Sequence, residues 1–156
     1  MSREHQDLLS RGALGTFRLN GQFLAVAEEL ARPAGLTAAW WQVLGAVLGE
    51  PLPVSGIARA MGITRQSVQR VADLLVERGL AEYRPNPAHR RAKLLAPTEE
   101  GRAAVSRVDP GHAAFAERLA EAYGAAYGET EFARAVEALE RLSTVLDALG
   151  PPVTEP

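Results

Sequence analysis

The sequence predicts a mainly α-helical protein with one small β-hairpin. Three observations support this fold class. Apolar residues recur at the three- and four-residue spacing of amphipathic helices along most of the 156 residues. Only residues 80–96 offer two short extended segments with turn residues between them. Hydrophobic residues make up 47% of the chain and aromatic residues only 6%, so an aliphatic and alanine-rich core is expected, which suits closely packed helices.

Two helices are expected in the first third of the chain. The first runs from about residue 6 to residue 31, where Pro33 follows and ends it. Thr37 can cap the second helix, which spans about residues 38–48 and ends in a stretch rich in glycine and proline.

A pair of helices joined by a tight turn follows. Ser55 is expected to cap a short helix that ends near Met61, and Gly62 comes just past its end. Thr64 is expected to cap the next helix, which runs to about Arg78. A short helix, a tight turn and a second helix form a helix-turn-helix motif.

The second helix of this motif has two faces. Apolar side chains at helical spacing predict a buried face, formed by Val68, Val71, Leu74 and Leu75. Long or hydroxylated side chains, which suit base edges and phosphates, occupy its exposed N-terminal part: Arg65, Gln66, Ser67, Gln69 and Arg70. The helix N-terminus at Thr64 also favours phosphate.

A basic hairpin follows the motif. Residues 80–84 and 94–96 can pair as two strands, and the segment between them is too rich in proline to be a helix or a central strand. Basic residues lie on its flanks and tip: Arg84, Arg90, Arg91 and Lys93. Such a hairpin beside a helix-turn-helix is a wing, whose arginines could reach along a DNA duplex into the minor groove.

Two long helices complete the chain. Thr98 should cap the first of them, and residues 109–111 (Asp-Pro-Gly) should kink or break it before it ends at Gly124 or Gly128. Thr130 should cap the last helix, about residues 131–149. Its apolar stripe consists of Phe132, Val136, Leu139, Leu142, Val145 and Leu146. This stripe is longer than a small monomeric core can use, which favours a homodimer.

Charge and composition narrow the function. Between Ser55 and Lys93 there are eight basic and three acidic residues, so this segment carries +5 and the remainder −7. A basic module in an acidic chain is typical of a local nucleic-acid footprint. The chain has no cysteine, and its three histidines are far apart, so no catalytic residue, metal or cofactor is expected. No segment is apolar enough to span a membrane, and a cytoplasmic protein is expected.

The ordered set of motifs resembles the MarR (multiple antibiotic resistance regulator) family. The matching segments include Ile57-Ala58, Met61-Gly62-Ile63, the run from Thr64 to Leu75, Gly79-Leu80, Arg90-Arg91-Ala92-Lys93 and Pro97-Thr98-Glu99-Glu100-Gly101. The resemblance implies a single domain over residues 1–156, with a winged helix-turn-helix lobe over 36–97 and dimerisation helices over 6–31 and 98–149.

The resemblance also implies roles for these parts. The first, fifth and sixth helices would form the homodimer interface, the fourth would read the major groove, and the wing arginine, by position Arg91, would reach the minor groove. The family wing usually carries an aspartate two residues before this arginine, where this chain has His89. A neutral histidine cannot hold an arginine by charge, which makes the wing geometry uncertain from sequence and pH-sensitive binding conceivable, although a plain exposed turn residue is the simpler interpretation.

Many members of the family bind small, often aromatic or anionic, molecules between the DNA-binding lobe and the dimer helices. Candidate ligand contacts here are Phe17, Trp40, Trp41, His112 and Phe115. Alternatively, both tryptophans only pack at the lobe junction, and His112 lies on a helix surface. The resulting prediction is a DNA-binding transcriptional regulator, specifically a repressor that responds to a small molecule and binds an inverted-repeat operator on double-stranded DNA. The alternative is a winged-helix module that contacts an acidic protein and binds no DNA.

Overall fold

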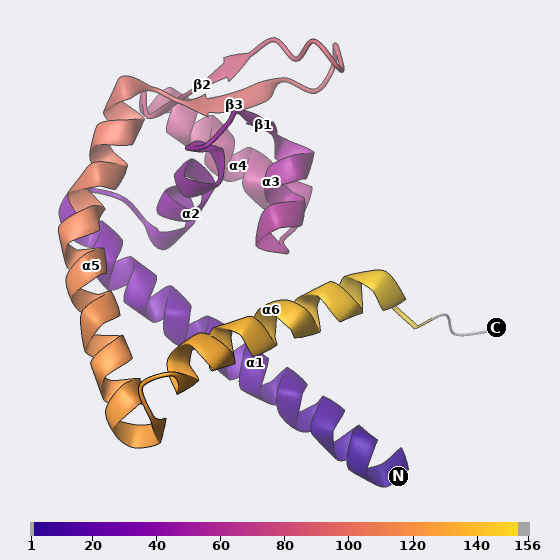
Figure 1. Ribbon diagram of the computed structural model, residues 1–156. Coiled ribbons are helices and arrows are strands. Elements are labelled where there is room, and N and C mark those ends of the chain that lie inside the picture. The colour runs from indigo at the N-terminus through magenta and orange to yellow at the C-terminus, as the bar shows by residue number, and fades with distance from the viewer. Residues whose placement is uncertain (1, 153–156) are drawn as a thin grey trace. The chain divides into compact units, whose positions relative to one another are not determined.

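The computed structural model describes residues 2–152, and its contacts divide the chain at Pro110 into two compact units. The N-terminal unit holds most elements, in the order α1 (Ser2–Ala31), the 3-10 helix η1 (Arg32–Ala34), α2 (Ala38–Val47), β1 (Leu52–Pro53), α3 (Val54–Met61), α4 (Arg65–Glu77), β2 (Ala81–Arg84) and β3 (Leu94–Pro97). Helix α5 (Glu99–Tyr127) passes from this unit into the C-terminal one, which ends with α6 (Glu131–Leu149) (Figure 1). The mainly α fold with a small β-wing is thus confirmed.

The wing belongs to a three-stranded antiparallel sheet in the order β1-β3-β2. In β2 and β3, Tyr83 pairs with Leu95 and Arg84 with Leu94, as expected for the hairpin. Strand β1, in which Leu52 pairs with Leu95, was not predicted from the sequence. A two-residue strand that contains proline has little sequence signal, and an edge strand tolerates proline because only one side needs hydrogen bonds.

The core of the N-terminal unit is aliphatic and alanine-rich. Leu44 of α2, Ile57 of α3, Leu75 of α4 and Leu95 of β3 are all fully buried. The predicted burial of Leu74 is wrong, since 37% of this residue is exposed. Burial on α4 follows Val68, Val71, Ala72 and Leu75, and Leu74 is turned about 100° from its neighbour Leu75.

Three of the predicted helix caps are confirmed. The hydroxyl oxygens of Thr37, Thr64 and Thr98 each accept a hydrogen bond of 3.1 Å from a backbone N–H three residues later. Two others are wrong. Helix α3 begins at Val54, so Ser55 lies inside the helix, and Thr130 already has helical backbone angles (φ −91°, ψ −9°) instead of the extended ones that a side-chain cap needs.

The predicted interruption near Pro110 does not break the helix. Helix α5 continues through Pro110 to Tyr127, so only the hydrogen bond that this imide nitrogen would donate is lost, while the turns on either side persist. The helix ends where predicted, before Gly128 with its positive φ of 118°. Helix α1 starts at Ser2, earlier than residue 6, because nothing in the mixed-charge N-terminal segment opposes helix.

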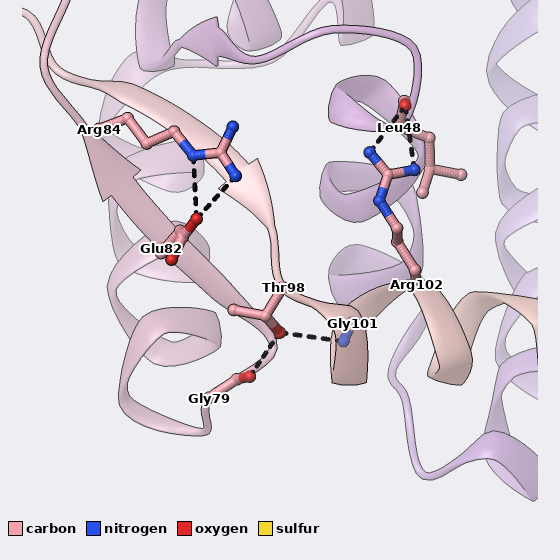
Figure 2. A network of polar contacts seen from close by, with 7 residues as sticks. All are labelled: Leu48, Gly79, Glu82, Arg84, Thr98, Gly101 and Arg102. Atoms are coloured by element: carbon pink, nitrogen blue, oxygen red, sulfur yellow. Dashed lines mark hydrogen bonds and ion pairs between the residues drawn. The ribbon is translucent and has the colours of Figure 1, made fainter.

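Thr98 fastens the start of α5 to the turn that follows α4. Its hydroxyl donates a 2.6 Å hydrogen bond to the Gly79 carbonyl and accepts one from the Gly101 N–H (Figure 2). The Arg102 guanidinium donates to the Leu48 carbonyl at 3.3 and 3.4 Å, which ties α5 to the end of α2. These contacts hold the end of α2, the turn after α4 and the start of α5 together next to the wing strands.

The C-terminal unit is the second half of α5 with α6. Aromatic side chains pack at the turn between the helices: the ring centre of Tyr123 lies 4.9 Å from that of Tyr127 and 5.5 Å from that of Phe132. Most of the predicted stripe on α6 is exposed, with Val145 and Leu146 more than half accessible. None of the helices described over residues 2–152 is both long and apolar enough to cross a membrane.

Candidate nucleic-acid interface

Helices α3 and α4 form the predicted helix-turn-helix. Gly62 ends α3 with a φ of +67°, a left-handed conformation that glycine adopts without strain, and the Ile63 N–H then bonds to the Ala58 carbonyl. The hydroxyl of Thr64 accepts from the Ser67 N–H and donates to the Ser67 hydroxyl oxygen at 2.9 Å. The Ser67 hydroxyl therefore keeps its own proton for an outside acceptor, such as a phosphate oxygen.

A groove of about 620 Å³ lies beside α4 and unites the predicted residues from both parts of the motif. Its lining includes Arg65, Gln66 and Gln69 of α4 together with Arg91 and Lys93 of the wing. Five further residues complete it, which sequence reasoning did not assign to the site: Pro53, Val54, Ser55, Tyr83 and Ala92. Pro53 and Val54 lie beside the wing because β1 pairs with β3, a pairing that has no signal in the sequence.

The cations around the groove differ in their surroundings. Arg65, Arg91 and Lys93 are exposed and form no ion pair within the described residues 2–152. Arg84 is also exposed, but its guanidinium bonds to the Glu82 carboxylate at 2.8 and 2.9 Å (Figure 2). Arg84 is thus the predicted cation whose charge is already partly neutralised by the chain itself.

Five of the predicted residues do not line the groove: Thr64, Ser67, Arg70, Arg84 and Arg90. Arg70 and Arg90 are both exposed. Arg70 follows Gln69 on α4, and Arg90 lies in the loop between β2 and β3. Both guanidinium groups are accessible to a ligand that is larger than the groove, such as a duplex that covers the whole face.

Gln69 takes part in a polar network on the groove wall. Its amide nitrogen donates to the Asp73 carboxylate at 3.0 Å and to the Tyr83 hydroxyl oxygen at 2.9 Å, while the Tyr83 hydroxyl donates to Asp73 at 2.5 Å. Partial burial, then the hydrogen bond to Asp73 and its negative charge, raise the pKa of Tyr83 to about 12. The phenol therefore keeps its proton at neutral pH.

His89 forms two hydrogen bonds within the wing loop. Its ring atom Nδ1 accepts a 3.2 Å hydrogen bond from the Ala92 N–H, and its backbone N–H donates to the Asn86 carbonyl. The Asn86 side chain in turn accepts from the Ala88 N–H at 3.0 Å. The histidine thus orders the backbone next to Arg91 through hydrogen bonds, which fits the interpretation as an exposed turn residue.

The structure places the five candidate ligand contacts in different surroundings. Phe17 lies on α1 with 71% of its surface exposed. Trp40 and Trp41 of α2 are half-buried against the core, and the Arg78 guanidinium lies 5.8 Å from the Trp40 ring centre. On the C-terminal unit's part of α5, His112 is exposed and Phe115 is half-buried.

Comparisons with known proteins agree with this geometry. The family model described as the MarR family matches residues 34–92, which cover the helix-turn-helix and most of the wing. An uncharacterized protein of Mycobacterium tuberculosis strain H37Rv is 41% identical over 116 residues, which are 74% of this chain and 81% of the relative.

Solved structures extend the likeness over most of the chain. A MarR family transcriptional regulator from Rhodococcus sp. RHA1 is 27% identical with a TM-score of 0.67, over 86% of this chain and 94% of that one. BpsR of Bordetella bronchiseptica, whose DNA binding is regulated by 6-hydroxynicotinic acid, is 25% identical with a TM-score of 0.69, over 85% and 98%. Proteins of this kind regulate transcription and are not enzymes. The chain belongs to the MarR family of DNA-binding transcriptional regulators.

Proposed function

We propose that this regulator is a repressor that binds an inverted-repeat operator as a homodimer and responds to a small molecule. One observation carries the DNA-binding part of the proposal. The groove brings Arg65, Gln66 and Gln69 of α4 together with Arg91 and Lys93 of the wing. A surface with base-reading side chains on a helix and cations on an adjacent hairpin fits a duplex, with the helix in one groove and the hairpin on its flank.

Helix α4 would read the sequence. Gln66, Gln69 and Arg70 are exposed on the part of the helix that can enter the major groove, where each base pair presents a distinct pattern of donors and acceptors. Thr64, Arg65 and Ser67 lie at its N-terminus, where the helix dipole and unpaired N–H groups favour a phosphate. The helix would therefore combine base contacts with anchoring to the backbone.

The wing would add affinity more than specificity. Arg90, Arg91 and Lys93 are exposed on the hairpin, and an arginine there can enter a narrow minor groove, whose edge pattern is degenerate. Arg84 would contribute less, because a phosphate has to compete with the Glu82 carboxylate for its guanidinium. Within the wing, Arg91 is the residue we expect to matter most, because it lines the same groove as α4.

Exposed apolar surface supports the homodimer. Leu9, Leu14 and Phe17 of α1 are each about 70% exposed. Leu142, Val145 and Leu146 of α6 expose about half of their surface. Contiguous apolar faces of this kind mark association sites, and a second copy of the chain would cover them. The dimerisation helices of residues 6–31 and 98–149 remain part of this proposal.

The likeness to BpsR supports a small aromatic or anionic effector. Its contacts would come from Phe17, Trp40, Trp41, His112 and Phe115, with the effector lowering the affinity for DNA and so relieving repression. Titrating small aromatic carboxylates into the protein–operator complex tests this part. Release of the duplex at micromolar to millimolar ligand supports it, and unchanged binding across the series argues against an effector of this class.

Selection of bound sequences from a pool of random duplexes tests the DNA-binding proposal. We expect enrichment of an inverted repeat with half-sites about 10 base pairs apart, centre to centre, because a two-fold dimer presents two α4 helices. A variant with Arg65, Arg70 and Arg91 all changed to alanine is the control, and it should enrich nothing. If the unmodified chain enriches no sequence either, the protein-interaction alternative is favoured over an operator-binding regulator.

A further inference from the structure

The loop at the tip of the wing lies outside the hydrogen-bonded part of the sheet. The pairing of β2 with β3 ends at Arg84 and Leu94, so residues 85–93 receive no support from the ladder. A side chain supplies a hydrogen bond instead, since His89 Nδ1 accepts from the Ala92 N–H at 3.2 Å. The described part of the chain offers this N–H no other acceptor. Bonds from a side chain to nearby backbone are a common way to hold a turn.

This hydrogen bond closes the turn that carries both wing arginines. Arg90 and Arg91 are the two central residues between His89 and Ala92. Both are exposed, but Arg91 lines the groove beside α4 and Arg90 does not. A closed turn restricts the backbone angles of its central residues, so it keeps Arg91 on the side of the groove.

His89 closes the turn without bringing a charge to it. Its Nδ1 can accept only while it carries no proton, and the neutral ring then has its proton on Nε2. Arg91 keeps its full charge, because it forms no ion pair among the described residues. Arg84 of the same hairpin is the opposite case, since Glu82 pairs with its guanidinium at 2.8 Å. A carboxylate at residue 89 could accept the same hydrogen bond, but it would offset one positive charge of the wing.

We propose, resting on the DNA binding proposed above, that His89 is a positioning residue for Arg91: its uncharged ring orders the wing turn and leaves the positive charge of the turn available to DNA. The order raises affinity, because a loop that already has its bound conformation loses less conformational freedom on binding. The absence of charge on the acceptor preserves the electrostatic part of the affinity, which grows with the number of phosphates that the protein neutralises.

Three substitutions of His89 separate these two effects. His89→Ala removes the acceptor. His89→Asn and His89→Asp each place an oxygen at the same number of bonds from the backbone as Nδ1, so both can close the turn, and they differ from one another in charge. His5→Ala is the matched control, because it removes another exposed histidine that lies outside the wing, on α1.

A salt titration of fluorescence anisotropy on the operator measures both effects. His89→Ala should weaken binding roughly two- to fivefold with an unchanged salt slope, as the loss of one net hydrogen bond gives. His89→Asn and His5→Ala should keep the affinity and slope of the unmodified chain. His89→Asp should weaken binding mainly at low salt and reduce the slope by about one unit, because its charge offsets that of one arginine. Unmodified affinity in His89→Ala, or identical behaviour of His89→Asn and His89→Asp, would overturn the proposal.

A double-mutant cycle shows whether His89 acts through Arg91. If it does, Arg91→Ala should cost less affinity in the His89→Ala background than in the unmodified chain, by the factor that His89→Ala costs alone. Additive effects of the two substitutions would overturn the proposal, because His89 would then act independently of this arginine.

Nuclear magnetic resonance on the protein without DNA tests the turn separately from the proposed function. At about pH 8, where imidazole is uncharged, the Ala92 amide proton should exchange slowly in the unmodified chain and in the Asn and Asp variants, and faster in His89→Ala. Equal exchange with and without the acceptor would overturn the proposal even if the chain binds its operator. Slow exchange in a chain that binds no duplex would instead overturn the proposed function, and the role of His89 in DNA binding with it.

Discussion

At the scale of single residues, the junction between the turn after α4 and the start of α5 is tightly packed. Thr98 bonds to both the Gly79 carbonyl and the Gly101 N–H. The backbone of Gly101 lies so close to Leu80 that a Cβ atom at residue 101 would stand 1.9 Å from the Leu80 carbonyl oxygen. That neighbour is backbone within a hydrogen-bonded turn, so it cannot move aside cheaply.

Gly101→Ala should therefore destabilise the lobe by about 2 kcal/mol or more, as overpacking against backbone does. Urea unfolding followed by circular dichroism measures this change. The control is Gly45→Ala on α2, where an added Cβ meets nothing within 4 Å and the better helix propensity should give a small gain. Equal urea midpoints for Gly101→Ala and the unmodified chain would contradict the packing described for this junction.

At the scale of elements, local signals were sufficient for most helices and for the hairpin. The caps at Thr37, Thr64 and Thr98 depend on residues three positions apart, and such patterns can be read from sequence. The errors arise where longer-range structure decides. Strand β1 exists only because β3 lies beside it, and α5 continues past Pro110 although proline disfavours a helix interior.

In the candidate site too, local features could be predicted from the sequence, whereas contacts between distant elements could not. Exposed polar residues on one helix face could be predicted from the periodicity of α4, and all five of them are accessible or partly accessible. The pairing of Gln69 with Asp73 also has a sequence signal, the spacing of four residues on a helix. The third member, Tyr83, is 14 residues from Gln69 and comes from a strand, so only the fold brings it to the groove.

At the scale of the whole molecule, the apolar surface left by each unit needs a partner. A dimer is expected at micromolar protein concentration, since burying the exposed leucines of α1 and α6 would gain roughly 25 cal/mol per Å² of apolar surface. Light scattering coupled to size exclusion measures the mass. Changing both Leu142 and Leu146 of α6 to glutamate should shift it toward the monomer. A monomeric mass for the unmodified chain would contradict the homodimer.

The central claim is that α4 and the wing contact one duplex together, with α4 choosing the sequence and the wing adding affinity. A salt titration of fluorescence anisotropy on operator and scrambled duplexes tests it most directly. Arg70→Ala should cost about 1–3 kcal/mol on the operator and less on the scrambled duplex. Arg91→Ala should weaken both and reduce the salt slope by about one unit, whereas Arg84→Ala, already paired with Glu82, should change it less. Unchanged affinity and salt slope in Arg91→Ala would contradict the claim.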